Sequence, residues 1–167
     1  GFALLEAPLL TPGGRALSGL PMEPEACAGA PPTSNAAFNG GPLDLGGGRY
    51  GRGIGLHAPC RAGFRLPAGS WRLCALAGVG DSARPCELAL VRLRVLGDAG
   101  RPLAESGPLR LGDPSWSLEV DLSGQSMVIL EADEGGDGRD CDHVVWADAM
   151  LLPASAPAAS QPVAGPQ

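Results

Sequence analysis

The residues from Ser115 to Leu122 alternate between polar and apolar side chains without a fault. A β-strand places successive side chains on opposite faces, so this alternation is typical of a half-buried antiparallel strand. The stretches 61–66, 71–77 and 88–95 alternate similarly, and the last changes phase between Leu90 and Val91, which predicts a β-bulge. The stretches 126–132 and 143–152 have continuously apolar segments and are also interpreted as strands.

Turn-forming residues separate these stretches. Glycine (26) and proline (17) together make up about a quarter of the 167 residues, which excludes a helical bundle. The chain is nevertheless 44% hydrophobic and only 18% charged, so it can bury a core. Its length suits one domain, and short strands joined by turns predict an all-β sandwich or barrel.

The charge pattern excludes other classes. All 12 basic residues are arginine, and 18 acidic residues give a net charge of −6. Nucleic-acid binding requires a basic stripe, which is absent, and no apolar run approaches the roughly 18–20 residues needed to span a bilayer. We therefore expect no nucleic-acid partner and no membrane insertion.

The composition divides the chain into three parts. Residues 1–14 are interpreted as an N-terminal segment or linker, 15–152 as the folded module, and 153–167 as a linker rich in Pro, Ala and Ser. The start at Gly1 and this tail predict a module cut from a longer chain. The five cysteines (Cys27, Cys60, Cys74, Cys86 and Cys141) leave at least one unpaired within the chain, and none lies in a CxxC spacing.

One glycine motif resembles a nucleotide-binding loop but has the wrong context. Residues 53–58 fit GxGxxG/A, yet Pro59 follows at once and no helical periodicity comes after it. We interpret the segment instead as a glycine-rich strand that a neighbouring backbone approaches closely.

The segment 131–143 holds the densest group of acidic residues and ends at His143, one of two histidines. The order of its acids does not match an EF-hand, but a glycine-flexible loop with several carboxylates can wrap a calcium ion (Ca²⁺). Asp133, Glu134 and Asp137 are the candidate ligands, and a solvated acidic turn is the alternative. Each histidine is either a hydrogen-bonded structural residue or a ligand contact.

Carboxylates can also bind the neighbouring hydroxyls of a sugar through paired hydrogen bonds. Few aromatic side chains are available for such a site, although the faces of a sugar stack on exposed aromatic rings. Trp71 and Trp116 are in phase with the apolar strand positions, so we expect them in the core. Trp146 follows the acidic segment and is the tryptophan best placed to border a site there.

Four segments together resemble the NPCBM family ("novel putative carbohydrate-binding module"), also classed as carbohydrate-binding module family 51. They are LDLGGGRYGRGIGLHAP (43–59), LAGVGD (76–81), DLSG (121–124) and GGDGRDCDHVVWADA (135–149). The resemblance covers residues 15–152, and the combined pattern is specific although each piece alone is weak.

The resemblance implies a galactose-binding-domain-like jelly-roll of two antiparallel sheets. It also implies a non-catalytic module of a secreted or cell-surface bacterial protein, with a glycoside hydrolase domain in the same chain. The ligand would be a galactose or N-acetylgalactosamine-type glycan, often with a structural Ca²⁺. The site would join the 137–146 segment to the 50–57 segment. Its residues are Tyr50, His57, Asp81, Asp142, His143 and Trp146.

Two alternatives remain. The family commonly has Asp where Val145 stands, and this difference favours a structural or protein-interaction module that has lost sugar binding. A glycoside hydrolase would need two carboxyl groups about 5–5.5 or 6.5–9.5 Å apart across a cleft. Glu131 and Glu134 could supply them, but a short chain with flat loops is poorly suited to build such a cleft.

Overall fold

The computed structural model describes residues 13–136, 138 and 140–155. Within these residues the chain forms thirteen strands, and all strand pairs are antiparallel. Three short 3-10 helices lie between strands: η1 (Leu17–Gly19), η2 (Asp81–Ala83) and η3 (Asp98–Gly100). This confirms the prediction of an all-β chain.

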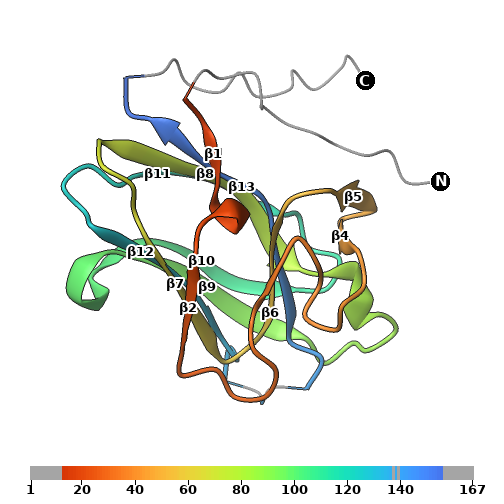
Figure 1. Ribbon diagram of the computed structural model, residues 1–167. Helices are drawn as coiled ribbons and strands as arrows, with labels where there is room; N and C mark the ends of the chain where they lie inside the picture. Colours follow the sequence, from red (N-terminus) through yellow and green to blue (C-terminus); the bar gives the residue numbers. More distant parts are fainter. Residues whose placement is uncertain (1–12, 137, 139, 156–167) are drawn as a thin grey trace.

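Two sheets form the body of the molecule (Figure 1). One has the order β11 (Trp116–Asp121), β8 (Trp71–Val79), β13 (His143–Pro153), β6 (Gly53–His57), β3 (Thr33–Ser34), and β1 (Arg15–Ala16) also pairs with β13. The other has the order β10 (Pro102–Arg110), β9 (Leu90–Leu96), β12 (Met127–Asp133), β7 (Cys60–Arg65), β2 (Met22–Glu25). The antiparallel two-sheet sandwich confirms the predicted fold.

The alternating residues point where their periodicity predicts. In β11, Leu118 and Val120 are buried while Ser117 and Glu119 are exposed. The main core fills the space between the sheets and includes Phe64 of β7. Trp71 is also in this core, and Trp116 packs against it, as expected. The strands β12 and β13 lie in the middle of their sheets, which explains their continuous apolar segments.

A small hairpin covers the outer face of the six-stranded sheet. It consists of β4 (Leu43–Leu45) and β5 (Gly48–Tyr50), and it lies at one side of the molecule in Figure 1. Leu43 and Leu45 form a second apolar cluster with Val145 of β13. Both faces of β13 are therefore buried at this point.

One local prediction was wrong, and one strand was not predicted. The strand β9 pairs with β12 without a register shift, and the phase change at Leu90 marks the end of an exposed loop that contains Leu88. The register shifts lie between β10 and β9 instead. The sequence did not predict β10 because prolines and a positive-φ glycine, Gly107, hide its alternation. Prolines are tolerated there because β10 is an edge strand.

Candidate functional site

The glycines of β6 let a loop lie directly against the strand. A Cβ added to Gly55 would be 2.2 Å from the carbonyl oxygen of Ala36, and one added to Gly53 would be 2.3 Å from the carbonyl oxygen of Trp146. Only glycine permits these approaches, so the interpretation of residues 53–58 as a closely approached strand is confirmed. The segment 33–41 is thereby held at the edge of the six-stranded sheet.

Hydrogen bonds fix the shape of this segment, which we call the 33–41 loop. The hydroxyl of Thr33 donates to the carbonyl of Ala36 at 2.7 Å, and the Gly53 N–H donates to Asn35 Oδ1 at 3.2 Å. The Gly41 N–H donates to Asn39 Oδ1 at 3.0 Å, closing a tight turn. The backbone of Phe38 is therefore held between fixed points.

The loop brings Phe38 against both histidines. Its ring centroid lies 5.0 Å from that of His57 and 4.3 Å from that of His143, in edge-on geometry. The two histidines are directly opposed on β6 and β13, with centroids 5.5 Å apart. All three side chains are partly exposed. We call this group the Phe38–histidine cluster.

Hydrogen bonds orient the two imidazoles. His57 Nδ1 lies 2.7 Å from the carbonyl oxygen of Ala58, which can only accept, so Nδ1 donates this hydrogen bond. His143 Nδ1 lies 3.0 Å from the Ser82 hydroxyl. Burial lowers the pKa of His143, and the neighbouring His57 lowers it further, against a smaller opposing effect of Ser82. The surroundings of His143 therefore favour its neutral form.

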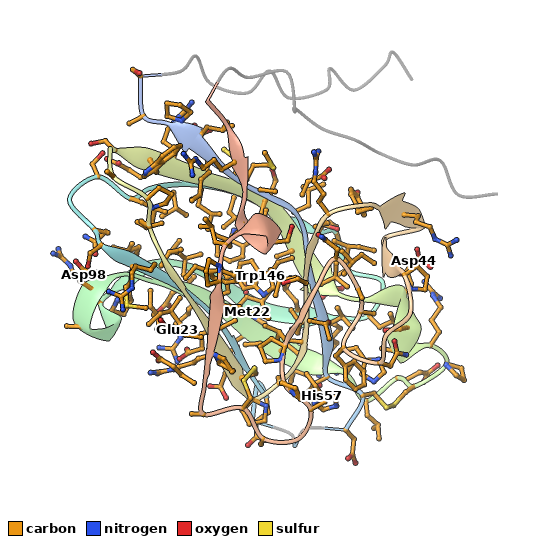
Figure 2. All side chains as sticks on the ribbon, viewed as in Figure 1. Met22, Glu23, Asp44, His57, Asp98 and Trp146 are labelled. Carbon is orange, nitrogen blue, oxygen red and sulfur yellow. A yellow bond between two sulfur atoms is a disulfide. The ribbon has the colours of Figure 1, made fainter. Side chains whose placement is uncertain are left out.

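An open pocket of about 470 Å³ lies between the 33–41 loop, the β4–β5 hairpin and η2. Figure 2 labels Asp44 of the hairpin and His57 of β6 near the periphery of the molecule. Ser82 both lines this pocket and contacts His143, so it links the pocket to the Phe38–histidine cluster. The lining residues are Asn39, Gly41, Pro42, Asp44, Gly47, Asp81, Ser82 and Arg84. We call this the end pocket.

Both carboxylates of the end pocket are held by the protein itself. Asp44 makes a bidentate ion pair with Arg49, with N–O distances of 2.8 and 2.9 Å. Asp81 accepts hydrogen bonds from the Gly46 and Gly47 N–H groups, at 3.2 and 2.8 Å. Asp81 thus fixes the hairpin turn and, with it, one wall of the pocket.

The structure brings together three of the six predicted sugar-contacting residues: His57, His143 and Asp81. It buries the other three, so the prediction that they contact a sugar at the surface is wrong. Trp146 has no exposed surface and packs edge-on against Trp116, with centroids 6.1 Å apart (Figure 2). Asp142 is equally buried and accepts the Leu90 N–H at 3.0 Å. Tyr50 is buried in the cluster beneath the hairpin.

Val145 does not face the site either. It is buried in the same cluster, and a Cβ added to Gly80 would lie 2.8 Å from its Cγ2. An aspartate here would place a carboxylate beneath the hairpin rather than in the pocket. The valine therefore gives no support to the alternative that sugar binding has been lost.

The predicted calcium ligands are only partly within the described residues. Asp133 ends β12, and its Oδ1 accepts the Glu134 N–H at 2.7 Å. Asp137 lies outside the described residues. No group of three or more His, Cys, Asp or Glu side chains in the described part of the chain could hold a metal ion. Two adjacent carboxylates fall short of the six to eight oxygens that Ca²⁺ takes, so calcium binding stays a prediction.

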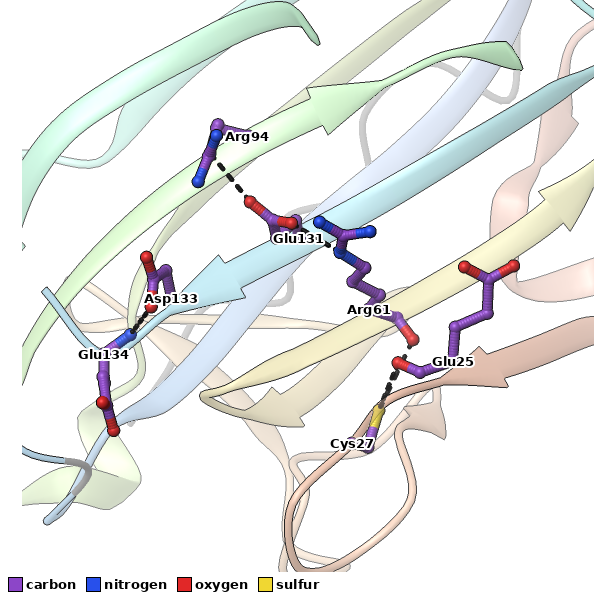
Figure 3. A network of polar contacts seen from close by, with 7 residues as sticks. All are labelled: Glu25, Cys27, Arg61, Arg94, Glu131, Asp133 and Glu134. Carbon is purple, nitrogen blue, oxygen red and sulfur yellow. Dashed lines mark hydrogen bonds and ion pairs between the residues drawn. The ribbon is translucent and has the colours of Figure 1, made fainter. Parts of the chain in front are cut away.

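A smaller hollow of about 230 Å³ lies on the outer face of the five-stranded sheet. Glu131, only 5% exposed, forms ion pairs with the Nε atoms of Arg61 and Arg94, at 2.6 and 2.8 Å (Figure 3). Glu25 and Glu105 occupy the next register positions, so charges alternate across all five strands. Glu131 is occupied by these ion pairs, which does not favour a role as a catalytic acid.

Several residues of the end pocket and of the Phe38–histidine cluster beside it were not predicted. Phe38 precedes Asn39 and two glycines, and an aromatic residue at the start of such a turn was an available signal. Ser82 and Arg84 carry no comparable signal, because they reach the site only through the path of the chain after β8.

Five cysteines form two disulfides, Cys27–Cys60 and Cys86–Cys141. Cys74 is unpaired and half-buried. Cys86–Cys141 joins the segment that follows η2 to the start of β13, next to the end pocket. No helix within the described residues is long and apolar enough to cross a membrane.

The chain is thus a two-sheet β-sandwich that carries a polar pocket among its loops. The model of the NPCBM/NEW2 domain matches residues 14–152, and the chain belongs to this family of carbohydrate-binding modules. The resemblance seen in the sequence is thus confirmed. No curated protein matches the chain.

Solved structures show the same fold at low identity. The CBM51-2 and INT domains of Clostridium perfringens ZmpB, in complex with GlcNAc, are 21% identical, with a TM-score of 0.77 over 86% of this chain and 32% of that one. A CBM51 from a Clostridium perfringens GH95 protein, in complex with methyl-galactose, is 21% identical, with a TM-score of 0.72 over 83% and 99%. Tandem CBM51 modules of a Streptococcus pneumoniae family 98 glycoside hydrolase are 18% identical, with a TM-score of 0.71 over 84% and 47%. The chain thus spans about a third of the ZmpB structure.

Proposed function

We propose that this carbohydrate-binding module holds a galactose-type glycan in the end pocket. The observation that carries the proposal is a polar pocket that lies beside the partly exposed ring of Phe38: Ser82 lines the pocket and contacts His143, and His143 packs against Phe38. The pocket volume of about 470 Å³ lies within the range of small-molecule sites. The family membership and the fold shared with a methyl-galactose complex support the ligand class.

The end pocket supplies the groups that recognise hydroxyls. Asn39 and Ser82 of the pocket lining offer an amide and a hydroxyl, and the adjacent Phe38–histidine cluster adds the ring nitrogen Nε2 of His57. A shallow site with one ring gives modest affinity, on the order of 0.05–1 mM, or about −4 to −6 kcal/mol.

We further propose that the module is non-catalytic and acts at the cell surface or outside the cell, beside a catalytic domain in the same protein. Asp44 and Asp81 are both held by the protein's own groups, which does not favour a pair of free catalytic carboxyls. Two disulfides are typical of proteins from oxidising compartments. A structural Ca²⁺ at the 133–137 segment belongs to the same proposal, and EDTA treatment tests it.

The described surface does not favour a protein-interaction module. Leu88 is the one large hydrophobic side chain of the described residues that is strongly exposed. Protein-docking surfaces usually present a contiguous apolar patch of several hundred Å².

Titration calorimetry with methyl β-galactoside and an N-acetylgalactosamine oligosaccharide tests the proposal. We expect millimolar to sub-millimolar binding that weakens at least about tenfold in Phe38→Ala. Leu88→Ala is the control, because it removes an exposed apolar side chain that does not line the pocket. A folded protein that binds neither sugar, or an F38A variant that binds as the wild type does, contradicts the proposal.

A further inference from the structure

The lining of the end pocket contains one cationic side chain, Arg84. Asp44 is neutralised by Arg49 in bidentate geometry. Asp81 makes no ion pair within the described residues, but both of its carboxylate oxygens accept backbone N–H groups. Arg84 is exposed, and no carboxylate of the described residues lies within 4.0 Å of its guanidinium. The pocket therefore presents one positive charge that no carboxylate of the described residues pairs with.

This positive charge contrasts with the chain as a whole, which carries a net charge of −6. An arginine on so acidic a protein has many possible carboxylate partners, and six other arginines of the described residues pair with one. Those six are Arg49, Arg52, Arg61, Arg65, Arg72 and Arg94, of which Arg61 and Arg94 share Glu131. Arg84 instead faces a pocket whose own carboxylates are occupied.

The backbone around Arg84 is fixed on both sides. Its N–H donates to the carbonyl of Asp81 at 3.1 Å, closing η2. Ala83 before it is buried, and Cys86 after it is joined to Cys141. The side chain thus extends from an anchored position, which lowers the entropic cost of binding a ligand.

We propose that the end pocket prefers an acidic glycan, a galactose-type sugar bearing a carboxylate or a sulfate ester, and that Arg84 is the residue that recognises this group. A planar guanidinium matches carboxylate and sulfate oxygens in bidentate geometry and binds them more strongly than neutral acceptors. The inference rests on the proposed function and specifies the chemical class of its ligand.

The chain offers a closely matched control. Residues 81–85 and 98–102 share the pattern Asp-x-x-Arg-Pro, and the Arg101 N–H donates to the Asp98 carbonyl at 3.2 Å just as Arg84 does to Asp81. Arg101 is equally exposed but does not line the end pocket. The variants R84Q and R101Q therefore make the same chemical change after two 3-10 turns that are closed by the same backbone hydrogen bond.

The experiment is titration calorimetry at 20 mM and 200 mM salt with four probes: methyl β-galactoside, its 3-O-sulfate and 6-O-sulfate, and galacturonic acid. We expect an anionic probe to bind about tenfold more tightly than the neutral one at low salt, with a smaller preference at high salt. R84Q abolishes the preference for the anionic probes over the neutral one, whereas R101Q leaves the affinities for all four probes unchanged. Comparison of the two sulfated probes with galacturonic acid shows whether the pocket prefers a sulfate ester or a carboxylate.

Each other outcome has a distinct meaning. Equal affinity for neutral and anionic probes overturns this inference and leaves the proposed function intact. A preference that survives in R84Q, or is lost equally in R101Q, also overturns it. Failure of the folded wild-type protein to bind any of the four probes overturns both the inference and the proposed function. Inorganic sulfate is titrated in parallel, and binding of sulfate alone with the same R84Q dependence contradicts a sugar-specific site.

Discussion

Asp81 and Asp98 make similar contacts after β8 and β9, two strands that follow one another in the chain and lie in different sheets. Asp81 accepts the N–H groups of Gly46 and Gly47, while Asp98 accepts those of Ser126 and Met127 and the Ser126 hydroxyl. These hydrogen bonds lower the pKa of Asp98, and the one from the Ser126 hydroxyl has the largest effect. Figure 2 shows Asp98 on the opposite side of the molecule from Asp44 of the end pocket.

This equivalence predicts separable effects of two matched substitutions. Asp81→Ala and Asp98→Ala both lower the melting temperature, because each releases a turn that a carboxylate holds. Only Asp81→Ala weakens sugar binding, by about tenfold, because only Asp81 shapes a wall of the end pocket. Thermal unfolding followed by circular dichroism, together with titration calorimetry, checks the pair. Equal binding losses in both variants would show that the effect on the site is indirect.

Gly55→Ala tests the close approach of the 33–41 loop. The added methyl group would lie 2.2 Å from the Ala36 carbonyl oxygen, so the loop must move, which lowers the free energy of unfolding by about 1–3 kcal/mol. Sugar binding falls as well, because Phe38 moves with the loop. Urea unfolding measures the first effect. Gly19→Ala is the control, since nothing lies within 4 Å of a Cβ there, and a similar loss in both variants would refute the packing argument.

The lowered pKa of His143 predicts how stability depends on pH. The folded state favours the neutral imidazole, so the unfolded chain takes up a proton first as the pH falls. The contribution is therefore fully present above the ordinary histidine pKa of about 6.5 and is lost as the pH falls through the lower pKa of the folded state. We expect the melting temperature to fall between pH 7 and pH 5, and less steeply in His143→Gln. A wild-type slope that is unchanged in this variant would assign the effect to other groups.

The buried ion pairs of Glu131 contribute to stability rather than to binding. Glu131→Ala leaves Arg61 and Arg94 without their shared carboxylate and lowers the free energy of unfolding by about 2–3 kcal/mol. Glu105→Ala, at the exposed end of the same row of charges, changes it by less than about 0.5 kcal/mol. Urea unfolding distinguishes the two. Sugar binding remains unchanged in both variants. A loss of sugar binding in Glu131→Ala would indicate that the site lies on the outer face of the five-stranded sheet instead of in the end pocket.

Residue periodicity was sufficient to predict the strands with one buried face. The alternation at Trp116, Leu118 and Val120 indicated both the strand and its inward face, because only one face of β11 is covered. Periodicity could not be used at Trp146, whose position was inferred from the acidic segment before it, because the hairpin covers the outer face of β13 and the main core covers the inner face. A strand buried on both sides has no alternation from which to infer exposure.

The candidate site was predicted only in part for a related reason. His57 and His143 are 86 positions apart in the numbering, and their family motif placed both near the ligand before β6 and β13 were known to be paired. Phe38 and Arg84 belong to no such motif. Phe38 reaches the two histidines because two glycines admit the 33–41 loop, and Arg84 reaches the end pocket because η2 turns the chain after β8.

The sequence by itself determined the class of fold, the closely packed glycines of residues 53–58 and the family, because these depend on local patterns. Only the tertiary structure decided which cysteines pair, which of the predicted contacts are buried and which charge in the end pocket is free of an ion pair. Those properties depend on which segments meet across the sandwich. Trp146 and Arg84 illustrate this: packing removed the first from the surface, and the occupied carboxylates of Asp44 and Asp81 left the second available to a ligand.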